Sequence, residues 1–94
     1  MRYRARPVLV EAFKLSSDVE MTAPEWFMKL VNENKARIDR ALVDGAVTVY
    51  GCTIEKSSGN ERAKVGQYIV RDGKNSVRVM EPIDFNQLYE AVRK

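Results

Sequence analysis

The chain has 94 residues, of which 45% are hydrophobic and 31% are charged, and its formal net charge is +3. These values are typical of one globular domain with a modest core, so we expect residues 1–94 to form a single domain. No apolar run approaches the ~20 residues that span a bilayer, and the N-terminus lacks the apolar segment of a signal peptide. We therefore expect a cytoplasmic protein with no membrane partner.

The residue types that most often carry catalysis are scarce. The chain has no histidine, which excludes the commonest general base, the commonest metal ligand and every Ser-His-Asp triad. Its single cysteine, Cys52, cannot form an internal disulfide, and one cysteine is too few for a zinc site. Neither a phosphate-binding glycine loop nor a dinucleotide-binding glycine motif occurs. We therefore expect no catalytic residue, no metal and no cofactor.

Carboxylates offer the remaining route to catalysis. Glu55 and Glu61 flank a predicted hairpin and can face each other across it, as the carboxylates of a glycosidase do. Lys56 and Arg62 alternate with them, which favours the interpretation that all four are solvated hairpin residues. We therefore expect a protein that is not an enzyme, with a carboxylate-based hydrolase as the enzymatic alternative.

The N-terminal segment alternates basic and apolar residues. Arg2, Arg4 and Arg6 stand at every second position, so an extended strand would place all three on one face. Pro7 follows them and lacks a backbone donor, which favours an edge strand or a strand entrance. Residues 8–13 continue as an apolar strand. The three arginines either keep an exposed sheet edge soluble or bind successive phosphates.

A helical region is predicted after this strand. Thr22 and Glu25 have the spacing of a capping box. Apolar residues then recur at helical spacing, so we expect a helix over residues 23–32 and a second helical stretch over residues 35–43, separate from the first or continuous with it. Asp44-Gly45 is expected to end it, because glycine readily adopts the left-handed conformation of a helix stop.

The remainder of the chain has the pattern of antiparallel strands and one closing helix. Turn residues at 56–60 and at Asp72-Gly73 predict two hairpins. Helical spacing after Pro82 predicts a closing helix that buries Phe85 and Leu88 against Ile69 and Val79. The predicted strands are residues 46–50, continued by or paired with 52–55, then 61–65, 67–71 and 76–79.

These elements predict an α+β fold. We expect a curved, mostly antiparallel sheet, or partial barrel, with an N-terminal helical segment and a short C-terminal helix on one face. Trp26, in the first helix, is expected to pack on the sheet and to be largely inaccessible.

Basic and aromatic residues are the candidates for binding. The two ends of the chain are basic and its middle is acidic, so ends that meet in one sheet would form a basic surface. An aromatic ring beside such a surface can stack on a base. The residues to which we assign anion or partner binding are Arg2, Arg4, Arg6, Lys64, Arg71, Arg78 and Tyr68.

Three stretches together resemble a group of small, uncharacterised phage and prophage proteins. Residues 1–14 resemble the group's basic opening, which is followed by Pro-Val and an aliphatic-Glu-Ala-aromatic run. Residues 24–26, Pro-Glu-Trp, resemble its early helix. Residues 65–71, with Pro82, Phe85, Tyr89 and Glu90, resemble its Pro-Gly-Asp-Tyr hairpin and ending.

The chain also departs from this group. Val65 replaces the usual proline, Gln67 replaces the usual aspartate, and the region over residues 32–44 is longer than usual. The resemblance implies a phage- or prophage-encoded accessory protein in the cytoplasm of a bacterial host. The group has no assigned catalytic residues, so none is transferred to this chain.

Two functional hypotheses follow. The first is a non-enzymatic binding protein that acts on a host or phage protein or assembles with itself. The alternative is a protein that binds or sequesters an anionic nucleotide or nucleic acid through its basic N-terminal and hairpin residues. Salt dependence separates them, because binding to phosphates weakens steeply with salt.

Overall fold

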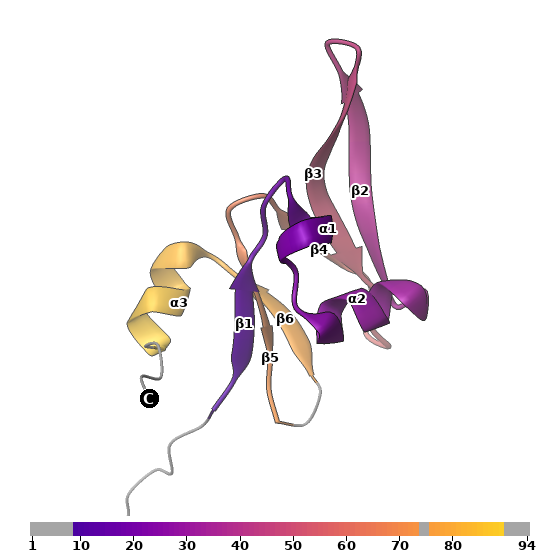
Figure 1. Ribbon diagram of the computed structural model, residues 1–94. Helices are drawn as coiled ribbons and strands as arrows, with labels where there is room; N and C mark the ends of the chain where they lie inside the picture. Colours follow the sequence, from indigo (N-terminus) through magenta and orange to yellow (C-terminus); the bar gives the residue numbers. More distant parts are fainter. Residues whose placement is uncertain (1–8, 74–75, 90–94) are drawn as a thin grey trace, which may run out of the picture.

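The computed structural model describes residues 9–73 and 76–89 of the chain. Figure 1 shows its strands and helices in an α+β arrangement, as the sequence predicts. In chain order, the elements are β1 (Glu11–Lys14), α1 (Val19–Thr22), α2 (Glu25–Asn32), β2 (Ala36–Val43), β3 (Ala46–Ile54), β4 (Glu61–Lys64), β5 (Tyr68–Arg71), β6 (Val77–Met80) and α3 (Pro82–Leu88).

The described strands form two three-stranded antiparallel sheets, and the sheets do not close into a barrel (Figure 1). One sheet has the order β1-β5-β6, so the first strand lies beside the hairpin near the C-terminus. The other has the order β2-β3-β4. Gly66, with a φ of 102°, lies in the turn that leads from β4 into β5. That backbone conformation favours glycine, because it is strained for residues with a Cβ atom.

Aromatic side chains join α2 to the β1-β5-β6 sheet. Phe27 is completely buried. Its ring centroid lies 5.0 Å from that of Phe13 in β1, and Trp26 meets Phe13 edge-on at 5.7 Å. Trp26 therefore packs on the sheet as predicted, but it is half-buried rather than inaccessible. The guanidinium carbon of Arg71 lies over the Trp26 ring, 4.9 Å from its centroid.

The predicted helix over residues 35–43 is wrong, because this segment is strand β2. Asp44 and Gly45 have φ angles of 50° and 81°. Positive φ at both central residues defines the two-residue turn that best fits the twist of a β-hairpin, and Asp-Gly is a preferred sequence for it. The dipeptide that we interpreted as a helix stop is therefore a hairpin turn, which returns the chain along β3.

The helical segment also begins differently from the prediction. The helix expected over residues 23–32 is confirmed as α2, but Pro24 is its N-cap and no side chain caps it. The hydroxyl of Thr22 donates instead to the backbone oxygen of Asp18, 3.2 Å away, within the short helix α1. The predicted capping box is therefore not formed.

Helix α3 covers a different face of its sheet from the predicted one. Phe13 and Ile69 are register partners and share the face that contacts α2, whereas Tyr68, the next residue along β5, points to the opposite face. Phe85 stacks on Tyr68, with ring centroids 4.1 Å apart. The expected burial of Phe85 against Ile69 is therefore wrong, and Leu88 is 66% exposed rather than buried.

Replacing Leu88 by alanine is accordingly expected to change the free energy of unfolding by no more than the ~0.5 kcal/mol of a surface substitution. Replacing Phe85 by alanine should cost more, because it removes the ring that stacks on Tyr68. Urea denaturation of the two variants measures both effects. A loss for Leu88→Ala as large as that for Phe85→Ala would contradict this position of α3.

Candidate functional site

The most prominent surface feature is a projecting two-stranded arm, which we define as residues 40–50. Its strands pair in register from Arg40 with Val49 to Val43 with Ala46, and Figure 1 shows them extending beyond the rest of the molecule. Strand β4 pairs with β3 only over residues 51–54. Beyond those residues the arm is a two-stranded ribbon, a structure that is marginally stable on its own in water.

A β-bulge separates the arm from the body. Asp39 pairs with Gly51, whereas the next residue, Arg40, pairs with Val49, so Tyr50 is an extra residue on β3. Bulges of this kind bend a strand and increase its twist. The bulge therefore gives the arm a direction of its own and leaves Tyr50 58% exposed at its base.

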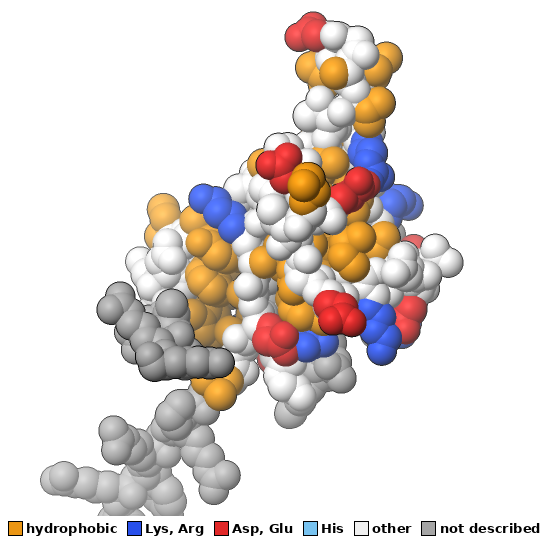
Figure 2. All heavy atoms as spheres, viewed as in Figure 1, with side chains coloured by type: hydrophobic (Ala, Val, Ile, Leu, Met, Phe, Trp, Pro, Cys, Tyr) orange, Lys and Arg blue, Asp and Glu red, His pale blue; other side chains and the backbone are white. Residues whose placement is uncertain are grey.

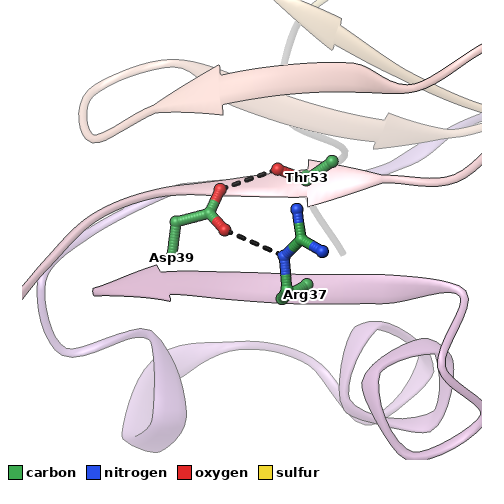
Figure 3. A network of polar contacts seen from close by, with 3 residues as sticks. All are labelled: Arg37, Asp39 and Thr53. Atoms are coloured by element: carbon green, nitrogen blue, oxygen red, sulfur yellow. Dashed lines mark hydrogen bonds and ion pairs between the residues drawn. The ribbon is translucent and has the colours of Figure 1, made fainter. Parts of the chain in front are cut away.

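Polar contacts fix the base of the arm (Figure 3). Thr53, which is 3% exposed, donates a hydrogen bond of 2.7 Å to Oδ2 of Asp39. Nε of Arg37 lies 3.2 Å from Oδ1 of the same carboxylate. Arg40 forms an ion pair with Glu20 of α1. The Asp39 contacts join β2 to β3 next to the arm, and the Arg40 contact joins the first residue of the arm to α1.

Replacing Thr53 by valine keeps the shape of the side chain but removes its hydroxyl donor. We expect a loss of ~1–3 kcal/mol in the free energy of unfolding, because a largely buried carboxylate loses a hydrogen bond. Thr48 is exposed in the arm, so Thr48→Val is the matched control and should leave stability unchanged. Equal effects of the two substitutions in thermal denaturation would contradict the role of the Asp39 network.

Cys52 lies beside this network and is fully buried. Burial, together with the charge of Asp39, raises the pKa of its thiol to about 12. A thiol with so high a pKa is a poor nucleophile at neutral pH, since the thiolate is the reactive form. Cys52 is therefore part of the core in this structure.

The distal part of the arm is apolar and exposed. Figure 2 shows hydrophobic side chains gathered at its tip, with an acidic side chain at the end. Asp44 is the one charged residue between positions 41 and 50. The large apolar side chains exposed on the arm are Leu42 (73%), Val47 (69%), Tyr50 (58%) and Val43 (51%). Leu42 and Val47 are register partners on one face of the ribbon, and Val43 is on the other face. Exposed apolar side chains gathered in this way mark a contact site for another molecule.

The residues that the sequence assigns to binding do not form one site in the described structure. Arg2, Arg4 and Arg6 lie outside the described residues. Lys64 is exposed on β4, in the β2-β3-β4 sheet, whereas the remaining three candidates lie on the β1-β5-β6 sheet.

Those three candidates already have partners within the chain. Arg71 forms an ion pair with Glu11 and lies over the Trp26 ring. Tyr68 stacks on Phe85. Arg78 points to the same face of the sheet as Tyr68, and its Nη2 donates to the Tyr89 hydroxyl at 2.6 Å.

A groove of about 640 Å³ lies beside Trp26 and Arg71. Lys29, Lys35 and Lys56 also line it. Two of these lysines have acidic neighbours: Lys35 lies 3.7 Å from Glu33, and Lys56 lies 2.6 Å from Glu61. The groove therefore gathers cations and an aromatic ring, with acidic side chains that offset part of the positive charge.

Glu55 and Glu61, the carboxylates considered for hydrolysis, do not pair across the hairpin. Glu61 is opposite Ile54 in the register, and its carboxylate accepts a hydrogen bond from Lys56. Within residues 9–73 and 76–89, no cluster of three acidic, cysteine or histidine residues is arranged to hold a metal ion. The helices of the same residues are too short or too polar to cross a membrane.

Comparison of the chain with protein-family models, with curated proteins and with solved structures finds no match. The arm is the feature that sequence reasoning missed, because it follows from the strand nature of residues 36–43. The signal for it is Asp44-Gly45 between Val43 and the run Ala46-Val47, since Asp-Gly flanked by strand-forming residues is the strongest short-range hairpin signal.

Proposed function

We propose that the chain is a non-enzymatic accessory protein that binds a protein partner, either another protein or a second copy of itself, through its arm. The observation that carries this proposal is the exposure of Leu42, Val47 and Tyr50 on a ribbon with little support of its own. Binding to a protein surface would cover these side chains and pair the open strand edges, which stabilises an exposed ribbon.

The charge of the arm favours a protein over a nucleic acid as its partner. Affinity for nucleic acids comes largely from Lys and Arg side chains on the phosphates. Residues 41–50 contain neither Lys nor Arg. The charge of Arg40, at the base, is offset by the carboxylate of Glu20. An apolar, weakly charged arm is suited to the surface of a protein.

The proposal extends to the phage or prophage origin and the bacterial cytoplasm that the sequence resemblance implies. Two of the resembling stretches are adjacent in space, because residues 11–14 pair with residues 68–71. Part of the arm falls in residues 32–44, the region that is longer than usual in this chain. We therefore assign the common stretches to the scaffold and the arm to a partner particular to this protein.

Site-specific photo-crosslinking in bacterial cells that express the chain tests this function. A photoreactive residue in place of Val47 should give adducts with protein that resist nuclease, and the additional substitution Leu42→Asp should abolish them. The matched control replaces Met21, which is 88% exposed on α1, and should give no such adduct. Failure of the Val47 probe to crosslink protein, or adducts that nuclease removes, would contradict the proposal.

The groove beside Trp26 supports a second candidate function, the binding of an anionic nucleotide. Lys29, Lys56 and Arg71 line it and would contact phosphates, and the indole ring would contact the base. Trp26 is the sole tryptophan, so its fluorescence reports on this groove. A nucleotide that binds there should change the emission, and added salt should reverse the change. Emission that does not respond to nucleoside mono-, di- or triphosphates would exclude this function.

A further inference from the structure

Strand β2 has an open edge in the arm. Within the described residues it pairs with β3 alone. Next to a two-residue turn, the flanking residues, here Val43 and Ala46, are the pair that exchanges both backbone hydrogen bonds. Because the pattern alternates, the backbone groups of Leu42 and Arg40 point away from β3. They are the groups that a further strand at this edge would bind.

An antiparallel strand edge can pair with a copy of itself about a two-fold axis, since the same segment then serves as both partners. The charges of the arm distinguish the possible registers. A two-fold axis at Arg40 would place two guanidinium groups opposite each other. An axis at Ala41 would place Arg40 opposite Leu42. An axis at Leu42 places Leu42 opposite Leu42 and Ala41 opposite Val43. It also brings Asp44, the first turn residue, near Arg40 of the other copy, whose guanidinium has enough donors for a second carboxylate beside that of Glu20.

We propose that the arm pairs with the arm of a second copy of this chain, β2 against β2, about a two-fold axis at Leu42. This inference rests on the proposed function, because it names the partner of the arm. Leu42 of each copy contacts Leu42 of the other on one face of the ribbon, and Ala41 lies opposite Val43 on the other face. Two marginal two-stranded ribbons then join in one four-stranded sheet, which pairs the open β2 edges with each other over residues 41–43.

Other molecules that could cover the open β2 edge match the residues of the arm less well. A membrane surface with anionic lipids attracts Lys and Arg, and the distal arm carries Asp44 and no basic residue. A strand of another protein would bind the edge through the same backbone groups, but nothing in the arm selects its sequence. A second copy of the chain is the partner that matches the arm residue by residue, because Leu42 then lies opposite Leu42 and Asp44 lies near Arg40 of the other copy.

A charge-complementation experiment tests the two-fold axis, because residue 42 faces itself in this register alone. Sedimentation of the wild-type chain should show a dimer. Leu42→Asp and Leu42→Lys should each be monomeric, since like charges meet at the axis, and an equimolar mixture of the two should dimerise. Leu42 is exposed, so both variants should keep the circular dichroism of the wild type. Met21→Asp, at a site on α1 that is more exposed than Leu42, is the control and should remain dimeric.

Disulfide trapping provides a second readout. Residues that exchange both hydrogen bonds across antiparallel strands have Cα atoms ~5.5 Å apart, which a disulfide spans. Leu42→Cys should therefore form a covalent dimer under mild oxidation, whereas Met21→Cys should not. Cys52 should not compete, because it is fully buried and its pKa is raised to about 12.

The outcomes separate this inference from the proposed function. A wild-type chain that stays monomeric while the Val47 probe still crosslinks another protein overturns the second copy as partner and keeps the arm as a binding site. A wild-type chain that stays monomeric, together with a Val47 probe that crosslinks no protein, would overturn both proposals. Two further results would overturn the two-fold axis at Leu42. One is a Leu42→Asp variant that still dimerises, and the other is a mixture of Leu42→Asp and Leu42→Lys that stays monomeric.

Discussion

Replacing Gly51 by alanine is expected to destabilise the protein by at least the ~1–3 kcal/mol of an overpacked core. A Cβ atom at this position would lie 2.2 Å from the carbonyl oxygen of Ala63 and 3.3 Å from its carbonyl carbon. Both are backbone atoms of β4, so no side-chain rotation relieves the clash. Because Gly51 is a register partner of Lys64, the substitution forces β4 away from β3 at the end of their pairing.

Gly73→Ala is the matched control for this prediction. A Cβ atom at Gly73 has nothing within 4 Å, and the backbone there does not require glycine. Alanine at such a site leaves stability unchanged or raises it slightly, because it restricts the unfolded chain. Urea denaturation of both variants gives the comparison. Equal midpoints for Gly51→Ala and Gly73→Ala would contradict the close approach of β3 and β4.

The elements that sequence reasoning predicted correctly have local signals. Asp72-Gly73 marks the hairpin between β5 and β6, and Pro82 marks the start of α3. These signals depend on the backbone preferences of the residues themselves, so neighbours in the sequence suffice to interpret them. Helix α2 was predicted for the same reason, from an apolar stripe that follows a proline.

Strand β2 was mispredicted because its local signals favour a helix. Ile38, Ala41 and Leu42 have helical spacing, and Gly45 fits a helix stop as well as a hairpin turn. The choice depends on residues 46–54, which pair with the whole of β2. Pairing across a turn is a tertiary effect that overrides weak propensity, and the pattern of a single segment does not contain it.

The binding candidates show a second limit of sequence reasoning. The placement of basic and aromatic residues identified Tyr68, Arg71 and Arg78 as binding candidates, but their contacts depend on which face of the sheet each residue occupies. Since faces alternate along a strand, a shift of one residue exchanges the face covered by α2 for the face covered by α3. Tyr68 and Arg78 consequently contact Phe85 and Tyr89 in α3 and its cap, and Arg71 lies beside α2.

Phe27→Ala is expected to cost ~3–5 kcal/mol in the free energy of unfolding, which is the usual cost of removing a buried phenylalanine. Phe27 is 0% exposed and is among the largest fully buried side chains. Its ring contacts Phe13 of β1 and lies 6.3 Å from Trp26, at an interplanar angle of 88°. Truncation therefore leaves a cavity between α2 and the β1-β5-β6 sheet and removes the contact that joins them.

This loss is a large share of the ~5–15 kcal/mol that stabilises a typical domain, so Phe27→Ala should be partly unfolded at moderate temperature. Leu42→Ala removes an apolar side chain that is 73% exposed, and it should leave the stability of the monomer unchanged. Fluorescence of Trp26 follows both variants during urea denaturation, because its indole packs against the Phe27 ring. A cost for Phe27→Ala near that of Leu42→Ala would mean that α2 is not anchored to the sheet through this ring.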